Sequence, residues 1–320
     1  MRKPILDNYG RPTTKLRITL THKCNYKCIY CHMEGEETKE EVEMTPEEIE
    51  RLVSIAVQLG ISKIKLTGGE PLLREDLSEI IRRISKIKGI EDIAITTNGS
   101  LLKKLAAELA EAGLMRLNVN LPTIDPNTYR RITCVDRRPE EIIEGILKCK
   151  NAGISPIKVN MVILKGINDN EISKMMKFTR ENGLILQLIE LEKVGIDEKI
   201  YRKYYFKLDE IERELEKKAV KIIIRRDMQN RRRFRLADGT EVEIVRPYEN
   251  GSFCQACTRI RLTADGKLKP CLMRNDNLVD ILTPLRLGAE DTELKKIFIE
   301  AIKRREPYWK LKDTFSKCSI

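Results

Sequence analysis

The architecture of this chain can be traced outward from residues 15–31, which read KLRITLTHKCNYKCIYC. The first half of this stretch alternates polar and apolar residues, a pattern typical of a β-strand. The second half places Cys24, Cys28 and Cys31 within eight residues, and thiolates this close usually hold zinc or an iron–sulfur cluster. Because a closed tetrahedral site needs a fourth ligand, either His32 or a distant residue completes a structural zinc site, or one metal position stays open for chemistry. The rest of the sequence favours the open position.

The composition predicts a cytoplasmic protein. None of the chain's 320 residues lies in an apolar run long enough for a membrane span, and no signal-peptide pattern precedes the nine cysteines. Such a setting is reducing, so the thiols are available for metal; Cys134 and Cys149 are expected in the core. The net charge of +11 suits either nucleic acid or an anionic small substrate.

Strand and helix patterns alternate through the first 200 residues. Strands are expected at 15–21, 63–67, 92–96, 115–121, 156–164 and 184–191. Helices are expected between them at 45–59, 75–87, 101–112, 139–152 and 170–182. This alternation predicts an α/β fold built from parallel βα units, either open or barrel-like.

The pattern changes near residue 201. A charged helix at 208–218 is followed by hairpin signals at Asp238-Gly239 and Asp265-Gly266. We therefore expect two domains, residues 1–200 and a smaller β-rich region at 201–320.

The predicted strands carry polar residues at every second position. Arg17, Lys65, Asn118 and Lys158 each alternate with branched apolar residues. Since successive side chains of a strand point to opposite faces, one face of the sheet packs on helices and the other is polar and basic. The interior is expected to be wet and positive, as a site for a large anion requires.

Six arginines lie within residues 225–235. One interpretation is contact with nucleic acid. We favour the solvated face of a hairpin, because the run lacks the interleaved aromatic residues of a base-stacking surface.

A second set of three cysteines comprises Cys254, Cys257 and Cys271. The hairpin at 265–266 brings the last cysteine back towards the other two. On a strand, Arg259 and Arg261 share a face with Cys257, so two guanidinium groups are expected beside this set. Such groups suit phosphate oxygens or purine edges.

Several motifs resemble a known family. C-x3-C-x2-C with an aromatic residue before the third cysteine resembles the radical S-adenosylmethionine enzymes. The second set, FC-x2-CTR-x-RLT-x-DG-x4-CL, is similar to the GTP 3′,8-cyclases of molybdenum-cofactor biosynthesis, the MoaA family. So are GRP at 10–12, LTGGEPL at 66–72, TTNG at 96–99 and KGIND at 165–169. The resemblance implies an incomplete (β/α)6 barrel of the TIM type with a small C-terminal β-rich region that carries a second iron–sulfur cluster.

The resemblance also implies site residues. Each cysteine set would hold a [4Fe–4S] cluster, and the cofactor S-adenosylmethionine would contact Tyr30, Gly69, Glu70, Asn120 and Glu192. The contacts to GTP would come from Arg17, Lys63, Lys65, Thr96, Lys158, Arg259 and Arg261. The last two of these would also be catalytic.

The implied reaction converts GTP to (8S)-3′,8-cyclo-7,8-dihydroguanosine 5′-triphosphate, the first step of molybdenum or tungsten cofactor biosynthesis. The implied partners are an electron donor, the downstream cyclic pyranopterin monophosphate synthase and a second copy of the chain, with no nucleic acid and no membrane.

The chain departs from the family pattern at four places. Gln187 stands where many members have arginine, and Asn120-Leu121-Pro122 replaces Ser-Leu-Asp. Glu192 replaces an apolar residue, and residues 316–320 lack the usual double glycine. Two alternative functions remain: another radical S-adenosylmethionine enzyme with an auxiliary cluster, and a zinc-containing nucleic-acid-binding protein that uses residues 225–235.

Overall fold

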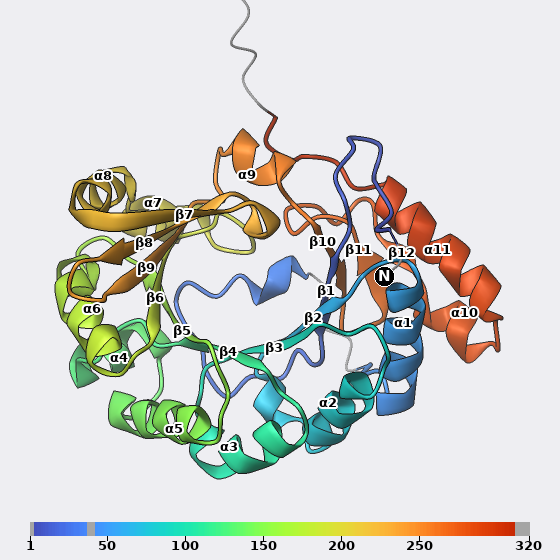
Figure 1. The fold of residues 1–320 in the computed structure, drawn as a ribbon, viewed down its shortest axis with the longest axis horizontal. Coiled ribbons are helices and arrows are strands. Elements are labelled where there is room, and N and C mark those ends of the chain that lie inside the picture. Colours follow the sequence, from blue (N-terminus) through green and yellow to red (C-terminus); the bar gives the residue numbers. More distant parts are fainter. Residues whose placement is uncertain (1–2, 37–41, 311–320) are drawn as a thin grey trace, which may run out of the picture.

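Six parallel strands form the centre of the molecule in a computed structural model that describes residues 3–36 and 42–310. They are neighbours in chain order and curve into an open arc (Figure 1). Their bounds are β1 Lys15–Thr19, β2 Lys63–Thr67, β3 Asp92–Thr97, β4 Arg116–Asn120, β5 Ile157–Ile163 and β6 Ile185–Glu190. The predicted incomplete (β/α)6 barrel is thereby confirmed.

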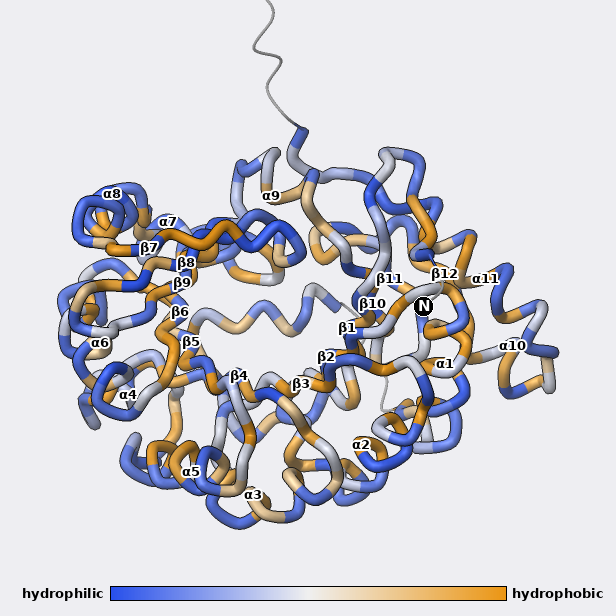
Figure 2. The backbone as a smooth tube through the Cα atoms, viewed as in Figure 1, coloured by the Kyte–Doolittle hydropathy of each residue, from blue (hydrophilic) through white to orange (hydrophobic). Residues whose placement is uncertain are grey.

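Helices cover the outside of the arc. These are α1 Pro46–Gln58, α2 Leu77–Ser85, α3 Leu102–Glu111, α5 Pro139–Asn151 and α6 Ile172–Glu181. Helix α1 begins with the expected capping box, in which Thr45 and Glu48 each bond the other's backbone N–H. Figure 2 shows hydrophilic outer turns and hydrophobic positions gathered between helices and sheet. Among the residues described here, no helix is long and apolar enough to cross a membrane.

The two faces of the strands differ as the alternation predicts. Leu16, Ile18 and Leu66 are fully buried in the core beneath the helices. Arg17 pairs in register with Lys65 on one side and with Arg261 on the other, so neighbouring strands place their cations at one level of the inner face. The inner face is therefore polar and basic.

The strands after residue 201 extend both edges of the same sheet. Beside β1 lie β10 Arg259–Leu262, β11 Lys267–Lys269 and β12 Val279–Asp280, and beside β6 lie β9 Glu241–Val245, β8 Arg231–Leu236 and β7 Ala219–Arg225. The sheet thus has twelve strands. Strands from both sides of residue 200 belong to this one sheet, so the sheet does not mark a boundary there. The division into two domains at residue 200 stays a prediction.

Further helices and 3-10 turns complete the fold. They are α7 Glu198–Tyr204, α8 Asp209–Lys218, α9 Gly251–Gln255, α10 Leu282–Arg286 and α11 Asp291–Lys303, with 3-10 turns η1 Met33–Gly35, η2 Pro71–Leu73, η3 Asp169–Glu171 and η4 Arg226–Met228.

The sequence analysis missed helix α4, Pro126–Thr133. Its signal is present, because Asp125 accepts a hydrogen bond from Thr128 N at 2.8 Å and Pro126 opens the first turn. Cys134 follows in a left-handed C-cap conformation and is exposed, so its expected place in the core is wrong. Cys149 is buried as expected.

Candidate active site

One cavity inside the arc is lined by the thiols of both cysteine sets, Cys24, Cys28, Cys31, Cys254, Cys257 and Cys271. Arg17, Arg259 and Arg261 line the same cavity. The two sets, more than two hundred residues apart in the chain, therefore face one common space.

The first cysteine loop follows β1 directly. Burial raises the pKa of the Cys28 thiol to about 12 and also raises the pKa values of Cys24 and Cys31. Loading a cluster here would therefore release protons, because the ligands of a metal are thiolates. All eight cysteines among the described residues are free thiols, and in that part of the chain no three His, Cys, Asp or Glu side chains lie close enough together to hold a single metal ion. Three soft donors per set fit an iron–sulfur cluster.

A glycine turn after β2 presses against this loop. The N–H groups of Gly69 and Glu70 donate to the carbonyls of Thr21 and Lys23, each at 2.7 Å. A Cβ atom on Gly69 would lie 2.3 Å from the Lys23 carbonyl oxygen. The side chain must therefore be absent for the turn and the cysteine loop to lie together at the cavity wall.

Glu70 lies behind this wall, fully buried and not among the residues that line the cavity. Its carboxylate accepts hydrogen bonds from Thr97 Oγ1 at 2.6 Å, Asn98 N at 2.7 Å and Leu72 N at 3.0 Å. Burial raises the pKa of Glu70 to about 7 despite these bonds. Its visible role is to order the loops after β2 and β3.

The second cysteine set lies between the N-terminal arm and the end of α11. Arg11 Nη1 donates to the Cys254 carbonyl at 2.8 Å, and Arg305 donates to the carbonyl of Cys257. Asp7 joins these two arginines, at 2.8 Å from Arg11 Nε and 3.5 Å from Arg305 Nη1.

The charge around Cys257 favours its thiolate. Burial alone would raise the pKa of this thiol, but Arg305 and Arg259 outweigh burial and lower it. A stabilised thiolate is the form that binds metal. The sequence marks Arg11 only as part of the GRP motif, and it carries no local signal for Arg305, which was not predicted.

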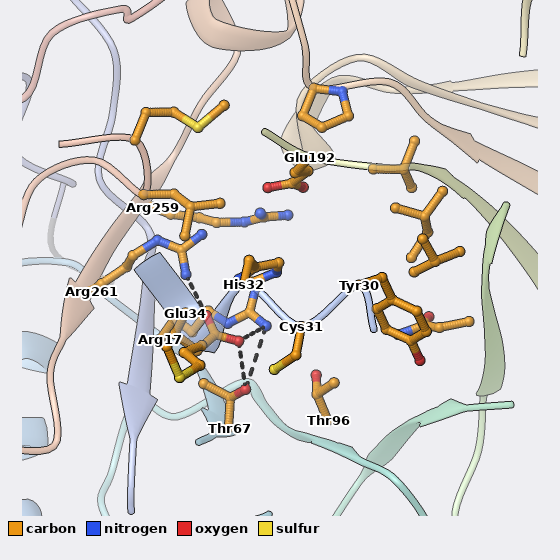
Figure 3. A pocket seen from close by; sticks show the side chains of 18 of the residues that line it. Arg17, Tyr30, Cys31, His32, Glu34, Thr67, Thr96, Glu192, Arg259 and Arg261 are labelled. Atoms are coloured by element: carbon orange, nitrogen blue, oxygen red, sulfur yellow. Dashed lines mark hydrogen bonds and ion pairs between the residues drawn. The ribbon is translucent and has the colours of Figure 1, made fainter. Parts of the chain in front are cut away.

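Glu34 is the second residue that sequence reasoning missed. It accepts from Arg17 Nη2 at 2.7 Å, Arg261 Nη1 at 2.9 Å and Thr67 Oγ1 at 2.9 Å (Figure 3). Burial would raise the pKa of Glu34, but Arg17 and Arg261 lower it to about 2. Residues 32–44 read as an irregular acidic stretch, so nothing local marked this carboxylate as part of the site.

Six groups at the cavity have buried polar atoms without a hydrogen-bond partner in the described part of the chain. They are Thr96 Oγ1, Glu192 Oε2, Arg17 Nε, Arg231 Nε, His32 Nδ1 and Trp309 Nε1. Figure 3 shows Thr96 and Glu192 on opposite sides of the space beside Arg259 and Cys31. Buried polar atoms are seldom left unpaired, so these atoms indicate a ligand that would satisfy them.

Side-chain amides cross the inner face from β4 to β9. Asn160 Nδ2 donates to Asn120 Oδ1 at 3.0 Å, and Gln187 Nε2 donates to Glu243 Oε1 at 2.6 Å. Asn120 and Gln187 line the cavity. Gln187, at a position where arginine was expected, is thus engaged with a buried carboxylate.

The predicted ligand residues divide into two groups. Those that line the cavity, apart from the cysteines, are Arg17, Tyr30, Gly69, Thr96, Asn120, Glu192, Arg259 and Arg261. Lys63, Lys65 and Lys158 do not line it. Lys63 lies 3.7 Å from Asp227, and Lys158 is buried 2.6 Å from Glu243. Lys65 is half-buried, and burial followed by the charge of Arg17 lowers its pKa well below the usual value.

Two protein-family models match successive parts of the chain. The model of the radical SAM superfamily matches residues 18–179, and the Molybdenum Cofactor Synthesis C model matches residues 184–311. A probable GTP 3′,8-cyclase of Thermococcus kodakarensis is 49% identical over 310 residues, covering 96% of this chain and 100% of the relative. One from Methanocaldococcus jannaschii is 48% identical over 306 residues, covering 96% and 99%.

Solved structures share the fold. Streptococcus suis SuiB matches with a TM-score of 0.63 at 18% identity, covering 94% of this chain and 68% of that one. SuiB bound to S-adenosylmethionine matches with a TM-score of 0.60 at 20% identity, covering 81% and 60%.

Proposed function

The chain belongs to the radical S-adenosylmethionine superfamily and, within it, to the GTP 3′,8-cyclase family of molybdenum-cofactor biosynthesis, and we propose that residues at the cavity carry out the reaction of this family. The enzyme converts GTP to (8S)-3′,8-cyclo-7,8-dihydroguanosine 5′-triphosphate. The observation that supports the assignment most directly is that both three-thiol sets and a surplus of cations border one cavity.

Cys24, Cys28 and Cys31 would hold one [4Fe–4S] cluster, and Cys254, Cys257 and Cys271 would hold the other. When bound, the first cluster would supply the electron for cleavage of S-adenosylmethionine, and the second would help to bind the substrate. Gly69 lines the cavity where it packs against the cysteine loop, and we assign it as the cofactor contact at that edge.

The other cofactor contacts are Tyr30, Asn120 and Glu192. Asn120 offers an amide beside the Asn160 side chain, and Glu192 has a carboxylate oxygen without a partner in the described chain. Glu70 acts indirectly, by fixing the loops that carry this edge.

The remaining polar groups orient GTP. Arg259 and Arg261 lie on β10 beside Cys257, Arg17 lies on the neighbouring β1, and Thr96 has an unpaired hydroxyl. Holding the ribose and the base in one fixed geometry is the protein's main contribution, because the cofactors supply the difficult chemistry. Lys63 and Lys158 are engaged with Asp227 and Glu243, and the contacts of Lys63, Lys65 and Lys158 to GTP stay a prediction.

The wider context is also part of the proposal. An electron donor reduces the enzyme, and cyclic pyranopterin monophosphate synthase uses the product. The enzyme is proposed to be cytoplasmic and to form a homodimer.

The test is anaerobic incubation of the reconstituted enzyme with GTP, S-adenosylmethionine and a reductant. We expect about eight iron atoms per chain, and mass analysis should detect 5′-deoxyadenosine together with the cyclised nucleotide. A colourless protein that carries only zinc would overturn the proposal.

Two variants test the division of labour between the clusters. Cys24→Ser should abolish cleavage of S-adenosylmethionine, whereas Cys271→Ser should mainly impair the nucleotide step. If both variants have the same effect on cleavage, the assignment of the two sets is wrong.

A further inference from the structure

The arginine run at residues 225–235 forms the hairpin of β7 and β8, and its side chains separate by face. Arg231 and Arg233 point to the inner side, with side chains 10% and 15% exposed. Arg232 lies on the opposite face, 2.6 Å from Glu216 of α8. Arg235 is 53% exposed. The predicted solvated face is therefore correct for Arg235 and wrong for Arg231 and Arg233, because the other edge of the hairpin joins the barrel sheet.

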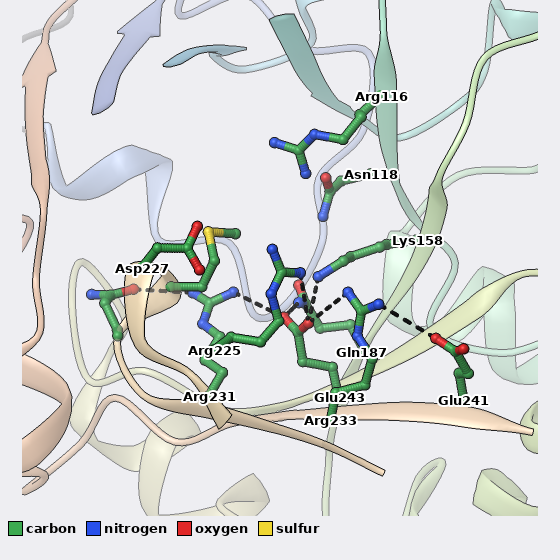
Figure 4. A network of polar contacts seen from close by, with 12 residues as sticks. Arg116, Asn118, Lys158, Gln187, Arg225, Asp227, Arg231, Arg233, Glu241 and Glu243 are labelled. Carbon is green, nitrogen blue, oxygen red and sulfur yellow. Dashed lines mark hydrogen bonds and ion pairs between the residues drawn. The ribbon is translucent and has the colours of Figure 1, made fainter. Parts of the chain in front are cut away.

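The inner arginines surround a single buried carboxylate, Glu243 of β9 (Figure 4). Arg233 lies 3.3 Å from it, Arg225 and Arg231 each lie 3.5 Å away, and Lys158 lies 2.6 Å away. The other carboxylates of the group are Glu241, which Arg233 and Arg235 share, and Asp227, which Arg225 shares with Lys15 and Lys63. The cations of the group therefore outnumber its carboxylates.

Arg225 and Arg231 are also direct partners across the two strands. Like charges directly opposite each other destabilise a sheet. Glu243 offsets part of this repulsion, but it is shared with Lys158 and Arg233. The pair is therefore a place where a further anion would be bound favourably.

Arg231 connects this cluster to the cavity. It lines the same space as the six cysteines, and its guanidinium lies 5.7 Å from the Phe253 ring centroid. Burial followed by the charge of Arg231 lowers the pKa of Arg259 well below its usual value. The two arginines therefore belong to one positive field, and Arg231 Nε has no hydrogen-bond partner in the described chain.

Resting on the function proposed above, we propose that the β7–β8 hairpin binds the triphosphate of the nucleotide substrate. Arg231, which lines the cavity, is the phosphate ligand, and Arg225, its cross-strand partner outside the cavity lining, adds positive charge behind it. Glu243 holds both guanidinium groups in position before the substrate arrives. Of the parts of GTP, only the triphosphate carries several negative charges, and guanidinium forks match phosphate oxygens in geometry.

The test compares GTP with guanosine. Binding of each to the reconstituted enzyme is measured anaerobically by calorimetry for the wild type, Arg225→Gln and Arg231→Gln, with inorganic tripolyphosphate as a competitor. The matched control is Arg235→Gln. It removes an exposed arginine of β8 that lies on the same side of that strand as Arg231.

We expect each of the first two variants to weaken GTP about tenfold or more and to leave guanosine within about twofold, with less competition by tripolyphosphate. Arg235→Gln should behave as the wild type. Arg231→Lys, which keeps the charge, should restore much of the GTP affinity and of the competition.

Three outcomes would overturn the proposal. They are an unchanged GTP affinity in both Gln variants, an equal loss for GTP and guanosine, and a failure of Arg231→Lys to bind GTP better than Arg231→Gln. Iron content and unfolding temperature show whether each variant is folded. A wild-type enzyme that binds neither ligand would instead refute the proposed function.

Discussion

Glu34 shows how much of this site depends on one side chain. Its carboxylate joins Arg17 of β1, Thr67 of β2 and Arg261 of β10 three residues after the last cysteine of the first set. Removing one partner of a buried charge pair is costly, because the remaining charge is left without compensation. The residue therefore couples the cysteine loop to the arginines of the substrate site.

The pH dependence of stability tests this role. The pKa of Glu34 is about 2 in the folded protein against an ordinary value of 4.5. The charged form thus adds stability above pH 4.5, and that stability is lost as the pH falls towards 2. At pH 7 we expect Glu34→Gln to lower the unfolding free energy by roughly 2–3 kcal/mol.

The deficit of Glu34→Gln should shrink as the pH falls from 4.5 to about 2, measured by urea unfolding at several pH values. Glu108→Gln, at an exposed position of α3, is the control and should differ little from the wild type at every pH. A deficit that stays constant with pH would show that the charge of Glu34 is not what stabilises the fold.

For single residues, the sequence predicted which face of a strand a side chain occupies, but not whether that side chain reaches the cavity. Period-two alternation correctly placed Arg17, Lys65 and Lys158 on the inner face of the sheet, but it does not indicate how far along a strand the cavity extends. Arg17 lines the cavity, whereas Lys65 and Lys158 do not. Glu34 could not be predicted, because its partner Arg261 is 227 residues away in the chain.

At the scale of elements, the turn after β2 and the cysteine loop after β1 form one unit. In Gly69→Ala the new Cβ would meet the backbone carbonyls of Lys23 at 2.3 Å and His22 at 2.6 Å. Backbone atoms cannot yield as a flexible side chain can, so the loop must shift. We expect binding of S-adenosylmethionine to weaken about tenfold or more, measured by equilibrium dialysis, with a lower iron content.

Gly239→Ala is the control for this prediction. Gly239 has a φ of +86° in the β8–β9 turn, and a Cβ there would meet nothing within 4 Å. Its replacement should cost about 1–3 kcal/mol of backbone strain and leave cofactor binding unchanged. Equal binding losses in the two variants would show that the close approach at Gly69 is unimportant.

Elements with a strong local period were predictable, and those with a weak local signal or long-range partners were not. The six barrel strands and the helices between them follow from alternation and from caps such as that of α1. Helix α4 has eight residues, too few to show a clear period. That β9 joins β6 and β10 joins β1 depends on pairing between distant segments, which no local pattern encodes.

For the whole molecule, both ends of the described chain meet at the second cysteine set, just before β10. Asp7 and Arg11 come from the N-terminal arm, and Arg305 comes from the residues after α11. Arg305 is almost fully buried and also donates to Thr13. These contacts surround the second cysteine set, so folding of the two ends and loading of that set should be coupled.

Arg305→Met tests this coupling, because methionine has a similar length but neither charge nor donors. The variant loses the hydrogen bond to the Cys257 carbonyl and one of the charges that lower the pKa of the Cys257 thiol. We expect unfolding free energy to fall by about 3 kcal/mol and iron to fall from about eight towards about four atoms per chain. The first cysteine set does not contact Arg305, so the remaining iron should still support cleavage of S-adenosylmethionine.

Arg304→Met is the matched control, since Arg304 is adjacent in sequence, lies near the surface and pairs with Glu300. It should retain about eight iron atoms and lose less than about 1 kcal/mol, as is usual for an exposed ion pair. If both variants keep their iron and unfold alike, the ends of the chain only cover the second set. If Arg305→Met alone loses half of its iron, the closing of the chain onto β10 is what makes Cys257 a ligand.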